Sequence, residues 1–392
     1  MKVLEKLSSF QYKHAAWILL IALIITTVLG IGISKVSMQS DMDQMMPQDL
    51  EIFKVEDRIQ DNFGGQDGSF VLIRIEEPEE NGVYDIRDPR IIEFLVELKT
   101  KLEKEDLIES TQSIGAMFTI DTIPPTLDYS KQIFSSIAGV NAFFNKDYSA
   151  TMMIISSDLG GGEDKIKELD SIINEALSET SKPDGVTVYI TGTPQIRSMI
   201  LDLLASDAVF TILIAALMIL VLLIILEKSA TKALLIFTPL LFGISWTLGT
   251  MGWLDIQLSV ATVGIGAMIL GLGVEYGVFI VSRYSEEREN KSSKKSLKIT
   301  VQEVGSSVLG SGTTTIMGFL ALTFSMMPML RDLGLSLALG IAFSLTAAIF
   351  INPALIVLEE RFEHLITEKK HKRLTEKTKQ HAKQKALNEK NH

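Results

Sequence analysis

Long apolar stretches interrupt the polar parts of this chain, and their lengths set the first expectation. Each of six stretches reaches or approaches the roughly 20 residues that a helix needs to cross a bilayer. They lie near residues 15–34, 208–226, 233–250, 256–281, 305–327 and 333–357. The charged segment 283–298 is expected to be a connection or surface helix, and the sixth span is expected to end at Asn352-Pro353. The pattern therefore predicts an α-helical membrane protein with six transmembrane helices.

A shorter periodicity fills the polar stretch at residues 38–205, between the first and second apolar stretches. Alternating or β-rich runs predict strands, and apolar residues repeated every three or four positions predict helices. Strands are expected at Ser69–Ile75, Leu107–Ile114, Thr151–Ser156 and Val186–Ile190, and helices at Pro89–Leu102 and Glu163–Leu177. The order strand–helix–strand, given twice, is that of a ferredoxin-like split βαβ sandwich. We therefore expect one large α+β domain between helices 1 and 2.

Two connections in this region leave alternatives open. Ile114–Asn145, between the two halves, is rich in Ile and Phe. It forms either helices packed on the sheet or an apolar wall that touches a lipid-like substrate. After the last strand, a helix is expected to start at Pro194, because proline suits the first turn of a helix. This helix should run past Asp207 into the second span, where Asp207 has either an interfacial or capping role or a role in substrate or proton entry.

Lysine and arginine predict the orientation, because cytoplasmic loops are rich in both. They gather before the first apolar stretch, at 228–232, at 283–298 and after the last stretch. We therefore expect a multi-pass protein of the plasma membrane with both termini in the cytoplasm. Residues 38–205 hold 14 Lys and Arg against 32 Asp and Glu, which is compatible with an extracytoplasmic place because long loops translocate regardless of charge. The expected division is helix 1 with the N-terminus at 1–36, the domain at 37–200, helices 2–6 at 201–360 and a basic cytoplasmic tail at 361–392.

Composition argues against soluble-enzyme chemistry. The chain is 47% hydrophobic and has no cysteine, and its five histidines all flank the apolar stretches. The sequence shows no Gly-rich phosphate loop, metal-ligand cluster or nucleophile elbow. We therefore expect no enzymatic activity, no catalytic residue, no metal or other cofactor, and no nucleic-acid partner.

The strongest candidate for function is Glu275, the only ionisable carboxylate in the fourth apolar stretch. A charge at that depth costs about 2.5–3.5 kcal/mol on insertion scales, so such a residue suggests a function by default. A carboxyl group in a medium of low dielectric constant is suited to bind and release a proton. Tyr276 adds a hydroxyl, and Gly271, Gly273 and Gly277 allow another helix to approach closely. The alternative is a Glu that only holds helices together.

The fifth apolar stretch carries a cluster of hydroxyl groups that is the second part of this candidate site. Serine and threonine in membrane helices usually bond to their own backbone carbonyls or let helices pack closely. A cluster at one depth also suits a hydrated path or a partner for Glu275. The candidates are Ser307, Ser311, Thr313, Thr314 and Thr315.

The layout of one span, a large α+β domain and five further spans resembles half of a resistance–nodulation–cell division (RND) transporter. The motif from Gly271 to Tyr276, followed by Ser282-Arg283-Tyr284 and Glu286-Glu287, is similar to the fourth-helix motif of that superfamily. The likeness is greatest to the hydrophobe/amphiphile efflux and MMPL-type lipid exporter branches. Glu275 stands where Asp is usual, and most members have twelve spans.

This resemblance implies a porter-like domain and a homodimer, since a single half would pair with a second copy. It also implies a transporter of hydrophobic or amphiphilic molecules or lipids, driven by the proton-motive force, with Glu275 and Tyr276 as the proton relay. Two alternatives are a protein-export accessory subunit of the SecD/SecF type and a non-transporting sterol- or lipid-sensing membrane protein.

Overall fold

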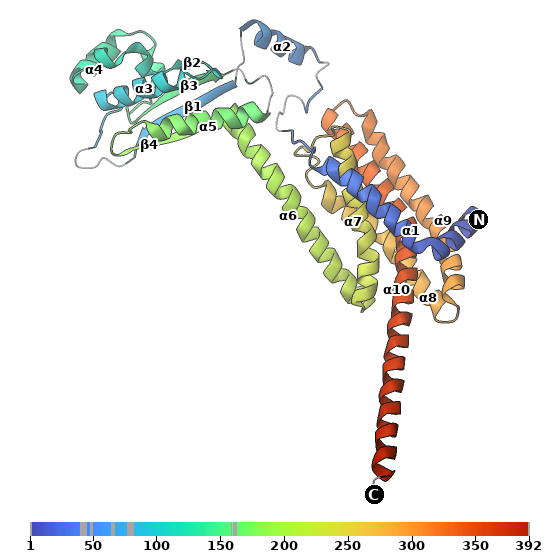
Figure 1. Cartoon of the computed structure of the whole chain (residues 1–392). Helices are drawn as coiled ribbons and strands as arrows, with labels where there is room; N and C mark the ends of the chain where they lie inside the picture. The colour runs from blue at the N-terminus through green and yellow to red at the C-terminus, as the bar shows by residue number, and fades with distance from the viewer. Residues whose placement is uncertain are drawn as a thin grey trace. The chain divides into compact units, whose positions relative to one another are not determined.

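The computed structural model describes residues 2–39, 45–47, 50–63, 67–76, 82–157, 159 and 163–390. The chain separates into two compact units (Figure 1). The helical unit comprises Met1–Met38 and Ser206–His392, and the α+β unit comprises Gln39–Ala205. Each unit has its own hydrophobic core.

Among the described residues, six helices are long and apolar enough to span a membrane, and they coincide with the six apolar stretches of the sequence. An apolar segment of this length forms a helix in lipid because a helix satisfies the hydrogen bonds of all its backbone groups internally. The helices are α1 (Lys2–Ile33), α6 (Thr193–Glu227), α7 (Ala230–Trp253), α8 (Ile265–Arg288), α9 (Ser293–Ala321) and α10 (Pro328–Lys390). A short 3₁₀ turn, η4 (Leu322–Phe324), follows α9. The side chains of the expected basic tail lie outside the described residues from residue 365 onward.

Three boundaries differ from the expectation, and the first is the start of the fourth span. Residues 256–264 were expected to be helical, but α8 begins at Ile265. The backbone N–H of Leu258 donates to the carbonyl of Ser37, and that of Ser259 donates to the Thr262 hydroxyl. These bonds hold residues 256–264 in a turn beside the end of α1. The segment is therefore apolar because it is largely buried, and not because it continues the helix.

The second and third differences lie at the other end of the bundle. The segment 283–298 was expected to be a connection or surface helix, but α8 continues to Arg288 and α9 starts at Ser293. The sixth span was expected to end at Pro353, but α10 continues through it. A proline inside a helix leaves the carbonyl four residues earlier without its donor. The Gln11 side-chain amide of α1 donates to that carbonyl, of Ile349, at 2.8 Å, and so offsets the lost bond.

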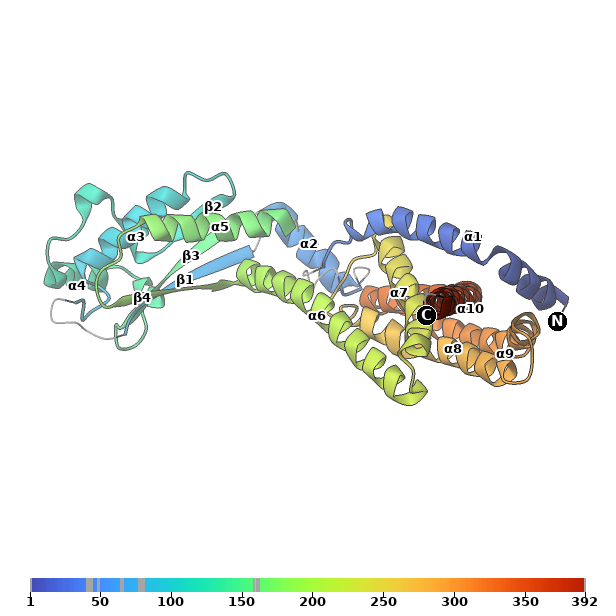
Figure 2. The ribbon, with the colours of Figure 1, turned by 60° about the horizontal axis from the view of Figure 1, so that its bottom comes forward.

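Glycines bring the helices of the bundle into close contact. A Cβ at Gly252 of α7 would overlap the carbonyl oxygen of Gly32 in α1. A Cβ at Gly243 of α7 would lie 2.5 Å from the hydroxyl oxygen of Ser344 in α10. Such contacts between small residues are how membrane helices pack without a hydrophobic driving force. In Figures 1 and 2, α7, α8, α9 and α10 accordingly lie side by side.

The α+β unit is built on a four-stranded antiparallel sheet in the order β2-β3-β1-β4. Its strands are β1 (Asp67–Ile75), β2 (Ile108–Gln112), β3 (Ala150–Ser157) and β4 (Val186–Gly192). Its helices are α2 (Glu51–Phe63), which the sequence did not predict, α3 (Pro89–Leu102), α4 (Leu127–Ser136) and α5 (Glu163–Glu179). The described strands and α3 and α5 lie close to their expected positions.

One face of this sheet is buried and the other is open. Val71 and Ile73 of β1 are fully buried with Met153 and Ile155 of β3, under the apolar faces of α3 and α5. On the opposite face, Leu72 is exposed. The alternation therefore follows the one-sided pattern of an antiparallel sheet. Gly192 ends β4 with a φ of +136°, a value that favours glycine, and α6 begins at the next residue.

The segment Ile114–Asn145 forms short helices that pack against the core. It contains η1 (Ile114–Met117), η2 (Ile120–Thr122), α4 and η3 (Val140–Phe143). Phe134 is buried between Phe118 and Phe144, with edge-on ring contacts at centroid distances of 5.8 and 5.3 Å. These phenylalanines therefore follow the first alternative, in which the segment packs against the core, whereas Ile120 is 65% exposed and does not.

A polar cluster ties the loop before α3 to the rest of the α+β unit. Asp85 accepts bonds from the backbone and guanidinium of Arg87 and pairs with Lys131 at 3.3 Å. The Arg87 guanidinium lies 3.6 Å from the ring centroid of Tyr148. Burial alone would raise the pKa of Asp85, but the bonds from Arg87 and Lys131 outweigh it and leave that pKa below its ordinary value.

Candidate functional site

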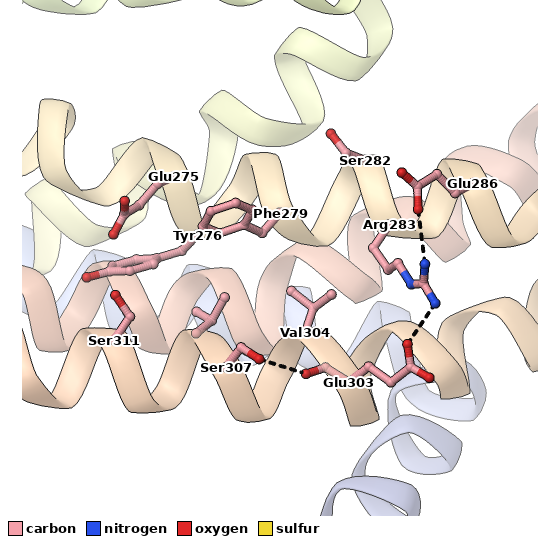
Figure 3. A pocket seen from close by; sticks show the side chains of 11 residues that line it. Glu275, Tyr276, Phe279, Ser282, Arg283, Glu286, Glu303, Val304, Ser307 and Ser311 are labelled. Carbon is pink, nitrogen blue, oxygen red and sulfur yellow. Dashed lines mark hydrogen bonds and ion pairs between the residues drawn. The ribbon is translucent and has the colours of Figure 1, made fainter.

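The candidate residues of the fourth and fifth spans meet at a cavity between α8 and α9 (Figure 3). Its volume is about 660 Å³. The two helices run antiparallel, so residues early in α8 face residues late in α9. The lining residues are Glu275, Tyr276, Phe279, Ser282, Arg283 and Glu286 of α8, and Glu303, Val304, Ser307, Val308 and Ser311 of α9.

Glu275 and Tyr276 occupy one end of this cavity in different environments. Tyr276 is 1% exposed and packs in the core of the helical unit, whereas Glu275 is exposed on the surface of the single chain. Figure 3 shows both side chains directed toward α9, with Ser311 pointing up toward them. A titratable group and a hydroxyl group therefore lie together where α8 faces α9.

The five candidate hydroxyls of α9 divide into two groups. Ser307 and Ser311 line the cavity, whereas Thr313, Thr314 and Thr315 are not among its lining residues. Thr313 donates to the Leu309 carbonyl, and Thr314 and Thr315 donate to the Ser311 carbonyl. These back-bonds are the ordinary behaviour of threonine in a membrane helix.

A cluster of ion pairs lies at the other end of the cavity. Arg283 of α8 bonds to Glu286 at 3.1 Å and to Glu303 of α9 at 2.7 Å. It also pairs with Glu287 at 2.8 Å, and Glu287 in turn pairs with Lys291. We call Arg283, Glu286 and Glu303 the charged mouth of the cavity. Neither Glu286 nor Glu303 was predicted as a site residue, because the facing of α8 and α9 depends on where the connection between them turns.

The predicted packing glycines lie on two sides of α8. A Cβ at Gly273 would lie 3.0 Å from side-chain atoms of Leu240 and Ser344, and a Cβ at Gly277 would lie 3.0 Å from Ile236. These two glycines therefore face α7 and α10. A Cβ at Gly271 would meet nothing within 4 Å, so in the single chain this glycine faces open space.

Asp207 is exposed on α6. The backbone carbonyl of Asp207 accepts a bond from the Thr211 hydroxyl at 2.7 Å. Asp207 does not line the α8–α9 cavity, so the structure does not bring it to Glu275. Among the described residues, no group of three or more His, Asp and Glu side chains is placed to hold a metal ion.

The chain is similar to known proteins over most of its length. The model of the MMPL family matches residues 44–384. A membrane protein of Methanocaldococcus jannaschii is 36% identical over 367 residues, which cover 92% of this chain and 95% of the relative. The siderophore exporter MmpL5 of Mycobacterium tuberculosis is 28% identical over 225 residues, which cover 54% of this chain and 23% of MmpL5.

A solved structure shares the fold at lower sequence identity. The hedgehog release protein Disp of the water bear Hypsibius dujardini superposes with a TM-score of 0.62 at 14% identity. The match covers 91% of this chain and 49% of Disp. The chain thus spans about half of Disp and less than a quarter of MmpL5.

Proposed function

The chain belongs to the MMPL family, and on this premise we propose that it is an RND-type transporter driven by the proton-motive force. It moves lipids or other amphiphilic molecules and works as a homodimer. Glu275 and Tyr276 form its proton relay. The name of MmpL5, a siderophore exporter, supports transport as the activity of the family.

The exposed position of Glu275 is the observation that carries this proposal. The side chain lies on a helix long and apolar enough to span a membrane, yet the single chain leaves it uncovered. A carboxylate facing lipid costs about 2.5–3.5 kcal/mol on insertion scales. Protonation or a covering surface removes that cost, so Glu275 is suited to couple proton binding to a rearrangement.

A second copy of the chain is the covering surface that we propose. Gly271 lies one turn before Glu275, and Gly310 and Gly318 lie on α9. A Cβ at any of these three glycines would meet nothing within 4 Å in the single chain. Open glycines allow close approach of another membrane helix. A two-fold pair would place the same surface of both copies together.

The remaining expectations concern the α+β unit and the orientation. The strand–helix–strand order, given twice, and the antiparallel sheet support a ferredoxin-like, porter-type domain. The expected division at 1–36, 37–200, 201–360 and 361–392 stays a prediction, as does the placement of both termini in the cytoplasm and of the domain outside. We retain a role for Asp207 at the outer membrane edge as part of this proposal.

Transport in liposomes tests the relay. A fluorescent phospholipid is the probe, and an imposed pH gradient is the driving force. Glu275→Gln keeps the size of the side chain but cannot titrate, so pH-driven movement should fall by roughly a hundredfold, the lower end of what a positioned proton-transfer group contributes. Glu275→Asp, which restores a carboxyl group, should recover part of it. Equal transport by wild type and Glu275→Gln contradicts the proposal.

Cross-linking tests the homodimer, because the chain has no native cysteine. Met268 and Leu272 lie on the exposed side of α8 with Glu275. Met268→Cys and Leu272→Cys should each give cross-linked dimers with a short thiol reagent in native membranes. Leu213→Cys on α6, which is 62% exposed, is the matched control. If neither α8 variant forms cross-linked dimers, this interface is refuted.

A further inference from the structure

The cavity between α8 and α9 extends well beyond Glu275. A helix rises about 1.5 Å per residue, so the eight steps from Glu275 to Arg283 span about 12 Å. The antiparallel α9 presents Glu303, Ser307 and Ser311 to the same cavity. These three residues are spaced four apart and thus lie about 6 Å from one another along the axis. The cavity therefore joins a carboxyl group at membrane depth to charged residues at a helix end.

We propose that this cavity is a proton path between Glu275 and the water at the basic end of the bundle. This inference rests on the proposed proton relay and adds its exit. Ser311 and Ser307 are the intermediate stations, and Glu303 exchanges protons with bulk water. The basic end is the α8–α9 connection with its surrounding residues, 283–298.

The chemistry of each station fits this assignment. A hydroxyl group both donates and accepts a hydrogen bond, so it passes on one proton for each that it receives and ends unchanged. The gaps of about 6 Å between stations exceed a hydrogen bond, and water fills them, because a cavity of about 660 Å³ holds many molecules of about 30 Å³ each. The Ser307 hydroxyl donates to the Glu303 backbone carbonyl at 3.3 Å, a long bond that it can exchange for one to water.

The ion pairs explain why Glu303 is the exchanging group. Its carboxylate bonds to Arg283 at 2.7 Å, and its side chain is 59% exposed. The bond to the guanidinium holds the Glu303 side chain at the mouth of the cavity, between Ser307 and bulk water. One transfer then leaves Glu275 as a carboxylate and Glu303 as a carboxylic acid, and Glu303 releases that proton to water. Glu286 also pairs with Arg283 but lies on α8, on the other side of the guanidinium (Figure 3).

Cysteine accessibility tests whether the path is hydrated. Ser307→Cys and Ser311→Cys should react with a charged, membrane-impermeant thiol reagent added on the basic side of sealed vesicles. Leu309→Cys lies between them in depth and is 38% exposed on another side of α9, so it is the matched control. We expect it to react at least tenfold more slowly. Equal rates at the three positions overturn the path.

Proton exchange tests the role of Glu303. Infrared absorption of the protonated Glu275 carboxyl, identified by its absence in Glu275→Gln, is followed after a pH jump on the basic side. Glu303→Gln should slow its equilibration by about a hundredfold, the lower end for a positioned proton-transfer group. Glu5→Gln removes an ion pair between α1 and Lys298 of α9 that does not line the cavity, so it should leave the rate within about twofold of wild type.

The outcomes separate the path from the relay. If Glu275→Gln keeps full transport, the relay itself is wrong, whatever the cysteines show. If Glu275→Gln abolishes transport but Glu303→Gln equilibrates at the wild-type rate, the relay stands and the path is refuted. Equal slowing by Glu303→Gln and Glu5→Gln also overturns the path, because it shows that the ion pairs act only by holding α9 in place.

Discussion

The bond from Gln11 to Ile349 gives a prediction whose size follows from the structure. Pro353 has no N–H group, so the Ile349 carbonyl has no donor in its own helix. The Gln11 amide supplies one at 2.8 Å, and Gln11 is fully buried. Gln11→Leu keeps a side chain of similar size but leaves this carbonyl without a partner. Interhelical hydrogen bonds in a membrane protein average about 0.6 kcal/mol and reach about 1.7 kcal/mol.

We expect the cost of Gln11→Leu to lie near the upper value, at about 1.5 kcal/mol, because the carbonyl has no alternative within α10. Pro353→Ala supplies that alternative, since the new N–H can donate to Ile349. In the Pro353→Ala background, Gln11→Leu should therefore cost less than about 0.5 kcal/mol. The cost is lowered further because the substitution removes the Gln11 side-chain oxygen, which is buried without a partner.

A double-mutant cycle on these two positions isolates the coupling. The free energy of unfolding is measured for the four proteins by denaturant titration in mixed micelles. Effects of Pro353→Ala on the free energy of unfolding that do not involve Gln11, such as the change in helix propensity, cancel in the cycle. A coupling energy of about 1 kcal/mol is expected. If Gln11→Leu costs the same in both backgrounds, Gln11 does not replace the missing backbone bond and the account of the uninterrupted α10 is wrong.

Three further predictions address other contacts. Gly252→Leu should destabilise the helical unit by more than about 2 kcal/mol in thermal unfolding, because the side chain would overlap the backbone of Gly32, whereas Gly30→Leu, which meets open space, should be nearly neutral. Thr26→Val removes the acceptor that the Trp246 indole finds at 2.8 Å, and should cost about 0.6 kcal/mol with a change in Trp fluorescence. The pKa of Asp85 in the folded chain lies below its ordinary value of 3.8. The ionised Asp85 therefore stabilises the fold fully at neutral pH, and this stabilisation is lost as the pH falls below about 4. Hydrogen exchange of the α+β unit should show the loss, and Asp85→Asn should abolish this pH dependence.

Hydrophobic patterning predicted the elements of this chain well, because each element buries its own face. The six apolar helices were predicted from apolar length, the strand β1 from its β-rich composition and the strand β4 from alternation. The errors arise where a residue acts through a distant partner. Pro353 signals a helix end in isolation, and its effect is offset by Gln11, which lies 338 positions before the Ile349 carbonyl that it bonds.

The site was predicted in part for the same reason. Glu275 stood out because a carboxylate in an apolar helix is costly, which is a local property. Glu303 carries no such signal, since a charged residue near a helix end is ordinary. Its place opposite Arg283 follows from the turn between α8 and α9 at 289–292, and a shift of that turn by one residue would rotate the helix by about 100°. Sequence spacing on one helix therefore identified Ser307 and Ser311 but not their relation to the charged mouth.

The two sides of α8 explain how a proton at Glu275 would act on the rest of the bundle. Gly273 and Gly277 fix one side of α8 against α7 and α10 at van der Waals distance, and a close-packed contact does not deform gradually. The side with Glu275 instead faces the cavity and α9. In the apolar part of α9 only 11% of the residues are buried, compared with 56% in α7, 50% in α8 and 67% in α10. A change of charge at Glu275 should therefore displace α9, and the charged mouth with it, while α7, α8 and α10 move as one body.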